Sequence, residues 1–230
     1  MKAIGFDLGR TLIGDENIPL SWKSLYKEAL IDILRRCNSN IDDKKIAIGE
    51  EILLKYNTRI NYRECEVSSD VIFSEILIKW KLNSQVNLAL VKETFFNYFQ
   101  RNVKLYEDTI LTLKTLKERG IKIGILTDVP YGMDKELVLA DIEKFKEYVD
   151  IVLTSVEVGY RKPNKQGFLQ LSKELMVDLN EMIYVGDEEK DIIGANCLGI
   201  YSILINRTNN DIRYGQRKTI KKLSEILDIT

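Results

Sequence analysis

The sequence of 230 residues contains no histidine and only three cysteines and three prolines. Without histidine the chain cannot form a Ser-His-Asp triad, a Cys-His dyad or a histidine-ligated zinc or haem site. Any chemistry must therefore depend on carboxylates, lysines, hydroxyls or a hard metal ion held by oxygen ligands. The cysteines show no Cys-x-x-Cys spacing, so neither a disulfide framework nor a zinc site is indicated; they are Cys37, Cys65 and Cys197.

Long apolar runs and excess charge are also lacking. No segment approaches the eighteen or so uninterrupted apolar residues of a membrane span, and charge interrupts residues 1–7 before a signal-peptide core could form. Lys and Arg number 34 against 35 Asp and Glu, a net charge of −1, which argues against a dedicated nucleic-acid-binding or membrane-surface protein. We therefore expect a cytoplasmic protein with neither a nucleic-acid partner nor a membrane partner.

What the sequence does contain is a change of pattern along the chain. A short apolar run at 2–8 suits a buried strand, whereas apolar residues between about 19 and 104 recur at helical spacing. From 107 onward the pattern alternates, with strands expected at 121–126, 151–153, 182–185 and 201–204. A helix that carries Ile110, Leu113 and Leu116 is expected to end at Gly120, and further helices are expected at 133–146, 166–175, 189–198 and 218–227. Such alternation predicts an α/β fold with a parallel sheet covered on both faces.

The helical stretch then forms an all-helical domain inserted into the α/β core. We expect the core at 1–13 and 105–230 and the insertion at 14–104. Aromatic residues near its end, Phe95, Phe96, Tyr98 and Phe99, recur at helical spacing, which favours packing inside the helical domain over substrate stacking.

Polar groups follow four of the expected strands. Asp7, Thr127 and Asp187 come at or directly after strand ends, and Lys162 lies in the loop after a fourth strand. Each alone could be a cap, a turn residue or a solvated side chain, but ligands of open parallel sheets bind beyond the carboxyl ends of the strands. Asp7 and Asp187 could share Mg²⁺, and Asp191 lies one helical turn after Asp187, on the same side.

Four segments resemble, in order, the motifs of the haloacid dehalogenase (HAD) superfamily, most of whose members are Mg²⁺-dependent phosphatases. The segments are Phe6-Asp7-Leu8-Gly9-Arg10-Thr11-Leu12, Ile123-Gly124-Ile125-Leu126-Thr127-Asp128, Ser155-Val156-Glu157-Val158-Gly159-Tyr160-Arg161-Lys162-Pro163 and Tyr184-Val185-Gly186-Asp187-Glu188-Glu189-Lys190-Asp191-Ile192. The helical insertion resembles the cap domain of the dehalogenase and β-phosphoglucomutase branch. The resemblance implies a Rossmann-like core with a helical cap.

The resemblance also implies roles for individual residues. Asp7 would be the nucleophile that forms an aspartyl-phosphate, and Thr127, Asp128 and Lys162 would bind the phosphoryl group. Mg²⁺ would be held by Asp7, the backbone carbonyl of Gly9 and Asp187, with Asp191 completing or orienting the ligand shell. The partner would be a small phosphorylated substrate, and the protein a monomer or homodimer.

One position departs from the family pattern: Gly9 stands where the phosphatases have a second aspartate, their general acid/base. Positioned proton transfer contributes about 10²–10⁴-fold to rate, so hydrolysis of alkyl phosphates is expected to be slow. A leaving group that needs no proton, such as an acyl or aryl phosphate, would avoid the difficulty, as would a substitute group among Arg10, Asp15 and Glu16. Phosphonatase or dehalogenase chemistry and a non-catalytic phospho-ligand-binding role are the alternatives.

Overall fold

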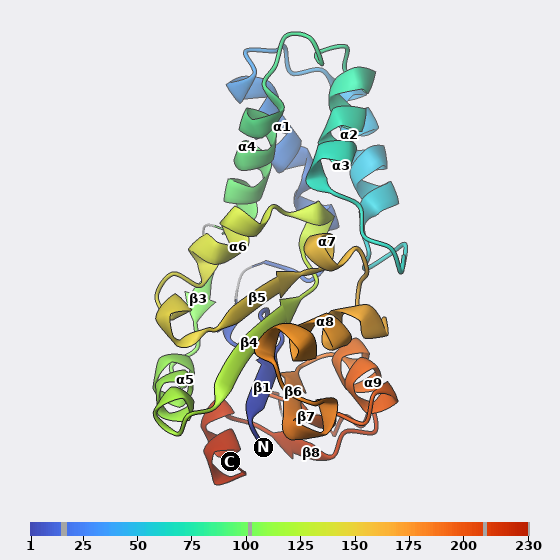
Figure 1. Ribbon diagram of the computed structural model, residues 1–230. Helices are drawn as coiled ribbons and strands as arrows, with labels where there is room; N and C mark the ends of the chain where they lie inside the picture. The colour runs from blue at the N-terminus through green and yellow to red at the C-terminus, as the bar shows by residue number, and fades with distance from the viewer. Residues whose placement is uncertain (15–17, 101–102, 209–210, 230) are drawn as a thin grey trace. The chain divides into compact units, whose positions relative to one another are not determined.

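The computed structural model describes residues 1–14, 18–100, 103–208 and 211–229 (Figure 1). The chain divides into two compact units. The core unit consists of Met1–Asp15, Val103–Asp128 and Leu139–Thr230, and the helical unit consists of Glu16–Asn102 and Val129–Val138. The sequence placed the whole of 105–230 in the core, so the segment 129–138 falls in a different unit from the one expected.

The core unit is built on a parallel sheet. Among the described residues, six strands pair in the order β5-β4-β1-β6-β7-β8, and every pairing is parallel. Their bounds are β1 Ala3–Phe6, β4 Lys122–Thr127, β5 Ile151–Thr154, β6 Met182–Gly186, β7 Tyr201–Ile205 and β8 Lys218–Ile220. Phe6 at the end of β1 is level with Ile125 of β4 and Val185 of β6, so the carboxyl ends of these three strands meet at one edge.

Helices cover both faces of the sheet, α8 and α9 on one and α5 on the other (Figure 1). The α-helices that follow Leu105 in the described part of the chain are α5 Thr109–Glu118, α6 Lys135–Asp141, α7 Ser155–Val158, α8 Lys165–Leu175 and α9 Glu189–Cys197. Phe168 and Leu171 of α8 lie in one buried cluster with Leu126 and Tyr184 of the sheet. A short antiparallel pair, β2 Ile13–Gly14 and β3 Lys104–Leu105, completes the unit. The expected α/β fold is confirmed.

Two expected helices differ in the structure. The helix predicted at 133–146 is the shorter α6, followed by a 3₁₀ turn at Lys146–Tyr148. The prediction of a helix at 218–227 is wrong. Lys218–Ile220 is the edge strand β8, and a 3₁₀ helix spans Leu223–Asp228. Ile220, Leu223 and Ile226 are all buried. Their three-residue spacing resembles an α-helical stripe, but it is also the period of a 3₁₀ helix.

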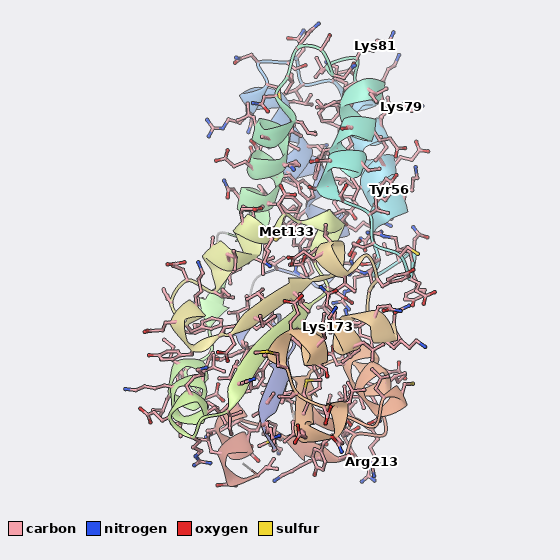
Figure 2. All side chains as sticks on the ribbon, in the orientation of Figure 1. Tyr56, Lys79, Lys81, Met133, Lys173 and Arg213 are labelled. Atoms are coloured by element: carbon pink, nitrogen blue, oxygen red, sulfur yellow. The ribbon has the colours of Figure 1, made fainter. Side chains whose placement is uncertain are left out.

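The helical unit contains α1 Tyr26–Arg36, α2 Asp43–Tyr56, α3 Ser69–Lys79 and α4 Leu88–Gln100, preceded by a 3₁₀ turn at Trp22–Leu25. Phe95, Phe96 and Phe99 of α4 are buried, as expected for packing residues. Figure 2 shows the charged side chains of Lys79 and Lys81, both exposed, projecting away from the end of α3. Across the described ranges, no helix combines the length and apolar character needed to cross a membrane.

The segment 129–138 belongs to the helical unit because Tyr131 packs there. Its ring stacks on Trp22 with centroids 5.5 Å apart and meets Phe95 edge-on at 5.5 Å. Its hydroxyl hydrogen-bonds the hydroxyl of Tyr26, which also accepts a 2.7 Å hydrogen bond from the Asn57 amide. These buried contacts join residues 31 to 109 positions apart in the chain, which no local pattern could reveal.

Candidate functional site

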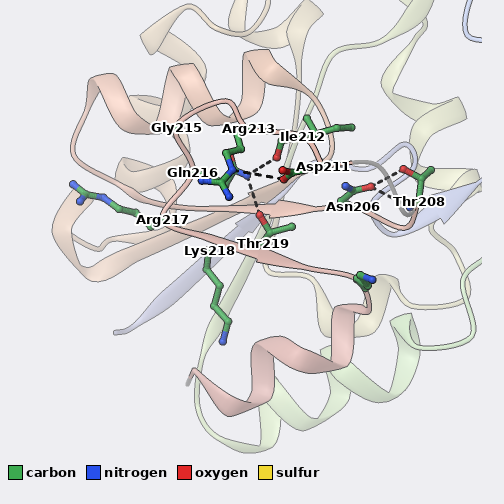
Figure 3. Close-up of a pocket in the computed structure, with 11 residues that line it drawn as sticks. Asn206, Thr208, Asp211, Ile212, Arg213, Gly215, Gln216, Arg217, Lys218 and Thr219 are labelled. Carbon is green, nitrogen blue, oxygen red and sulfur yellow. Dashed lines mark hydrogen bonds and ion pairs between the residues drawn. The ribbon is translucent and has the colours of Figure 1, made fainter.

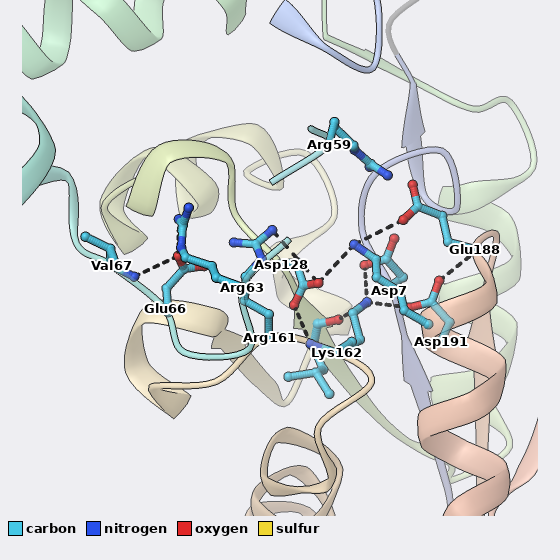
Figure 4. Close-up of polar contacts among 12 residues, drawn as sticks. Asp7, Arg59, Arg63, Glu66, Val67, Asp128, Arg161, Lys162, Glu188 and Asp191 are labelled. Atoms are coloured by element: carbon cyan, nitrogen blue, oxygen red, sulfur yellow. Dashed lines mark hydrogen bonds and ion pairs between the residues drawn. The ribbon is translucent and has the colours of Figure 1, made fainter. Parts of the chain in front are cut away.

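The carboxyl ends of three neighbouring strands bring the expected residues together. Asp7 follows β1, Thr127 ends β4 and Asp187 follows β6. Since β1 lies between β4 and β6 in register, these side chains meet at one edge of the sheet. Asp7 and Thr127 are both buried, and Lys162 reaches the same place from the loop between α7 and α8 (Figure 4).

Lys162 is the centre of this cluster. Its Nζ lies 2.6 Å from Asp7 Oδ1 and 2.6 Å from Asp191 Oδ1, and it donates hydrogen bonds to Tyr184 Oη at 3.1 Å and to the Leu126 carbonyl at 3.2 Å. Burial lowers the pKa of Lys162, but Asp191 and Asp7 outweigh it, so the pKa lies well above its usual value. The ammonium is therefore a fixed positive charge beside Asp7.

The carboxylates outnumber that charge. One oxygen from each of Asp7, Asp187 and Asp191 lies within 4.8 Å of the others. Burial raises the pKa of Asp7, opposed by Lys162 and reinforced by Asp191. Burial, together with Asp7 and Asp191, raises the pKa of Asp187. Three converging carboxylates fit a hard divalent cation such as Mg²⁺, which would offset their mutual repulsion.

Asp191 has both oxygens occupied by the protein. Oδ1 pairs with Lys162, and Oδ2 accepts the Glu188 N–H at 3.0 Å. The carboxylate folds back so closely that a Cβ on Gly186 would lie 2.4 Å from it, so only glycine fits there. These contacts allow Asp191 to orient Lys162 within the cluster of carboxylates.

Asp128 is buried in a different way, with its side chain 3% exposed. Its Oδ1 accepts the backbone N–H of Lys162 at 3.0 Å, and its Oδ2 lies 2.9 Å from Lys190 Nζ and 4.0 Å from an Arg161 nitrogen. Burial raises the pKa of Asp128, but Lys190, Lys162 and Arg161 lower it further, so it stays ionised. The carboxylate thus anchors the Lys162 loop.

Gly9 and Arg10 lie at the exposed rim of the cluster. A Cβ added to Gly9 would meet no atom within 4 Å, so the place of the missing aspartate is open space. Arg10 Nε lies 3.6 Å from Asp187 Oδ2. The other substitutes considered for the proton donor, Asp15 and Glu16, lie outside the described residues.

Three residues of the cluster were not identified from the sequence: Tyr184, Arg161 and Lys190. Tyr184 lies in the middle of a buried strand, where an aromatic residue is typical of a core. Arg161 and Lys190 flank motif residues at positions without a fixed chemical type. The sequence offered one signal for these residues. Lys190 lies between Gly186 and Asp191 in the fourth motif, and a buried cation there needs an anionic partner.

A second hollow lies elsewhere in the core unit, beside the loop after β7, with a volume of about 590 Å³. Cations line it, but Figure 3 shows the side chains of Arg217 and Lys218 pointing in different directions. They do not converge on one ligand position. The cluster around Asp7 is therefore the stronger candidate for a functional site.

Comparison with known proteins places this geometry in a family. The family model described as haloacid dehalogenase-like hydrolase matches residues 32–205. A HAD phosphatase from Thermococcus onnurineus superposes over 100% of this chain and 97% of its own with a TM-score of 0.67 and 25% identity. A 2-haloacid dehalogenase from Pseudomonas syringae superposes over the same shares with a TM-score of 0.70 at 20% identity, a likeness of fold.

Curated relatives include proteins named glyceraldehyde 3-phosphate phosphatase. The chain is 36% identical to the Methanopyrus kandleri protein over 46% of this chain and 45% of the relative. It is 24% identical to the Methanothermobacter thermautotrophicus protein over 100% of this chain and 94% of the relative. In the Methanopyrus case the chain thus spans about half of the relative's length. The family match covers most of this chain, and the chain belongs to the haloacid dehalogenase-like hydrolases.

Proposed function

We propose that the protein is a Mg²⁺-dependent phosphatase that hydrolyses a small phosphorylated metabolite through an aspartyl-phosphate on Asp7. The observation that carries the proposal is the buried Asp7–Lys162 pair at the edge of the sheet, surrounded by carboxylates in excess. The phosphatase names of the relatives support it. We infer that the protein acts in the cytoplasm, as a monomer or homodimer, without nucleic acid or membrane.

In the first half-reaction an oxygen of Asp7 attacks phosphorus. A new O–P bond forms as the bond to the leaving oxygen breaks, and that oxygen departs with the electron pair. A carboxylate nucleophile needs no base to activate it. Lys162 holds Oδ1 of Asp7 and neutralises the phosphoryl group, while the Thr127 hydroxyl at the end of β4 donates to a phosphoryl oxygen.

In the second half-reaction water attacks phosphorus of the aspartyl-phosphate and the bond between phosphorus and the Asp7 oxygen breaks, so that the Asp7 carboxylate is freed and both protons of the water leave on the released phosphate. Asp7, Asp187 and the Gly9 carbonyl are the groups that would hold Mg²⁺, and the ion would neutralise charge on the phosphoryl oxygens. Asp191 orients Lys162, and Asp128 holds the Lys162 backbone in place.

The open space at Gly9 determines which leaving groups suit the site. No acid stands there to protonate the departing oxygen. Substrates whose leaving group departs as a stable anion, such as aryl or acyl phosphates, are therefore favoured over alkyl phosphates. The same feature favours the second candidate, a phospho-ligand-binding protein without turnover.

The test is hydrolysis of para-nitrophenyl phosphate by the purified protein with Mg²⁺. We expect turnover that disappears in Asp7→Asn and in excess chelator. Asp32→Asn is the matched control, because Asp32 is an aspartate of α1 that pairs with Arg35 in the helical unit. Equal rates in the protein and in Asp7→Asn would refute the phosphatase and leave the phospho-ligand-binding role.

A further inference from the structure

Arg10 has a backbone conformation that its side chain does not favour. Its φ is +58°, in the left-handed region where residues other than glycine are strained. The turn is closed by a 2.6 Å hydrogen bond from the Arg10 N–H to the Ile13 carbonyl. Strained residues of this kind cluster at functional sites.

The side chain is not needed for packing. Its ion pair with Asp187 is 3.6 Å long, and 48% of the side chain is exposed. Arg207, in the same unit, is by contrast held by several contacts. It pairs with both Asp108 oxygens at 3.1 and 3.2 Å and donates to the Thr11 carbonyl at 2.9 Å. The exposed Arg10 guanidinium carries N–H groups that can donate hydrogen bonds to a ligand.

The position of Arg10 places those donors beside the proposed reaction centre. Asp187, its partner, has an oxygen within 4.8 Å of one from Asp7. The neighbouring residue, Gly9, leaves open space at the rim. This open space therefore lies beside the residue that carries the guanidinium and beside the carboxylates of the cluster.

We propose that Arg10 binds a second anionic group carried by the leaving group, so that the preferred substrates are phosphoanhydrides or phosphate esters with a phosphate or carboxylate next to the scissile bond. This inference rests on the proposed phosphatase function. The planar guanidinium matches two oxygens of a carboxylate or phosphate. It also stabilises the negative charge on the departing oxygen, which receives no proton from position 9.

The experiment compares kcat/KM for three substrates in the protein and in Arg10→Gly. Para-nitrophenyl phosphate has an uncharged leaving-group body, pyrophosphate carries a second phosphate, and ortho-carboxy-para-nitrophenyl phosphate carries a carboxylate. We expect Arg10→Gly to lower kcat/KM for at least one anionic substrate about tenfold more than for para-nitrophenyl phosphate, since a charge-assisted hydrogen bond is lost. The substrate affected tells phosphate from carboxylate recognition.

Two variants separate binding from structure. Arg10→Gly should raise the thermal unfolding midpoint, because glycine accepts the left-handed backbone, and Arg10→Lys should restore part of the preference. Arg213→Gly is the matched control, since Arg213 Nε also lies 3.6 Å from an aspartate and is exposed. An equal loss on all three substrates, or a lower midpoint in Arg10→Gly, overturns the inference while para-nitrophenyl phosphate turnover still supports the phosphatase.

Discussion

Two regions of this molecule bury polar groups, and they do so differently. In the helical unit Tyr26, Tyr131 and Asn57 form a neutral network among aromatic rings. At the edge of the core sheet, three described carboxylates converge near the one ammonium that pairs with two of them. The neutral network is satisfied by its own hydrogen bonds. The charged cluster brings three carboxylates within 4.8 Å of one another, and we propose that it is the reactive region.

The largest expected change in stability comes from removing the central cation of the charged cluster, Lys162. Lys162→Met leaves Asp7 and Asp191 buried without their partner, so we expect a loss of about 4 kcal/mol in the free energy of unfolding. Urea denaturation measures it. The double variant Lys162→Met/Asp7→Asn should recover part of the loss, and a loss below about 1 kcal/mol would contradict the structural role of Lys162.

In the helical unit, a substitution should change the free energy of unfolding through side-chain packing alone. Phe95 is fully buried and contacts Trp22, Phe73 and Tyr131. Phe95→Ala should cost about 3 kcal/mol, and that cost should be the same with and without Mg²⁺. Val71→Ala, on the exposed side of α3, is the control with little expected change. A cost for Phe95→Ala that varies with Mg²⁺ would erase the contrast between the regions.

Placing a carboxylic acid at position 9 tests whether the charged cluster lacks a proton donor for catalysis. Gly9 has room for a side chain and no positive φ, so Gly9→Asp should raise turnover of alkyl phosphates about 10²-fold, which is about 2.7 kcal/mol of activation free energy. Gly9→Ala fills the same space without a carboxyl and should bring no increase. An unchanged rate in Gly9→Asp would show that another group already transfers the proton, or that Arg10 captures the new carboxylate.

The smallest effect, taken per pH unit, is the pH dependence of stability. Burial and the neighbouring carboxylates raise the pKa of Asp187 to about 8. Because the folded state then holds its proton more tightly than the unfolded state, metal-free protein should lose stability as pH rises from about 4 towards about 8, by at most about 1.4 kcal/mol per pH unit. Thermal unfolding in chelator measures this. Mg²⁺ should restore the stability at the upper end, and Asp187→Asn should flatten the curve; stability that rises with pH across this window contradicts it.

Local patterns were enough for five of the six described strands of the sheet and for the polar residues that follow them. Asp7, Thr127 and Asp187 follow apolar strands, and parallel pairing alone brings such ends together. The contacts of Tyr131 with Trp22 and of Asp128 with Lys190 could not be predicted, because they join distant segments through side-chain geometry. Strand β8 was missed because three residues are too few to show alternation.

The most direct test of the central claim is the detection of a phosphoryl group on Asp7. The protein is mixed with Mg²⁺ and para-nitrophenyl phosphate, quenched in acid during turnover, digested and analysed by mass spectrometry. We predict one added phosphoryl group on the peptide that contains Asp7, removed by hydroxylamine and absent from Asp7→Asn. Turnover that persists in Asp7→Asn, or a phosphoryl group found on another residue instead, would contradict the account.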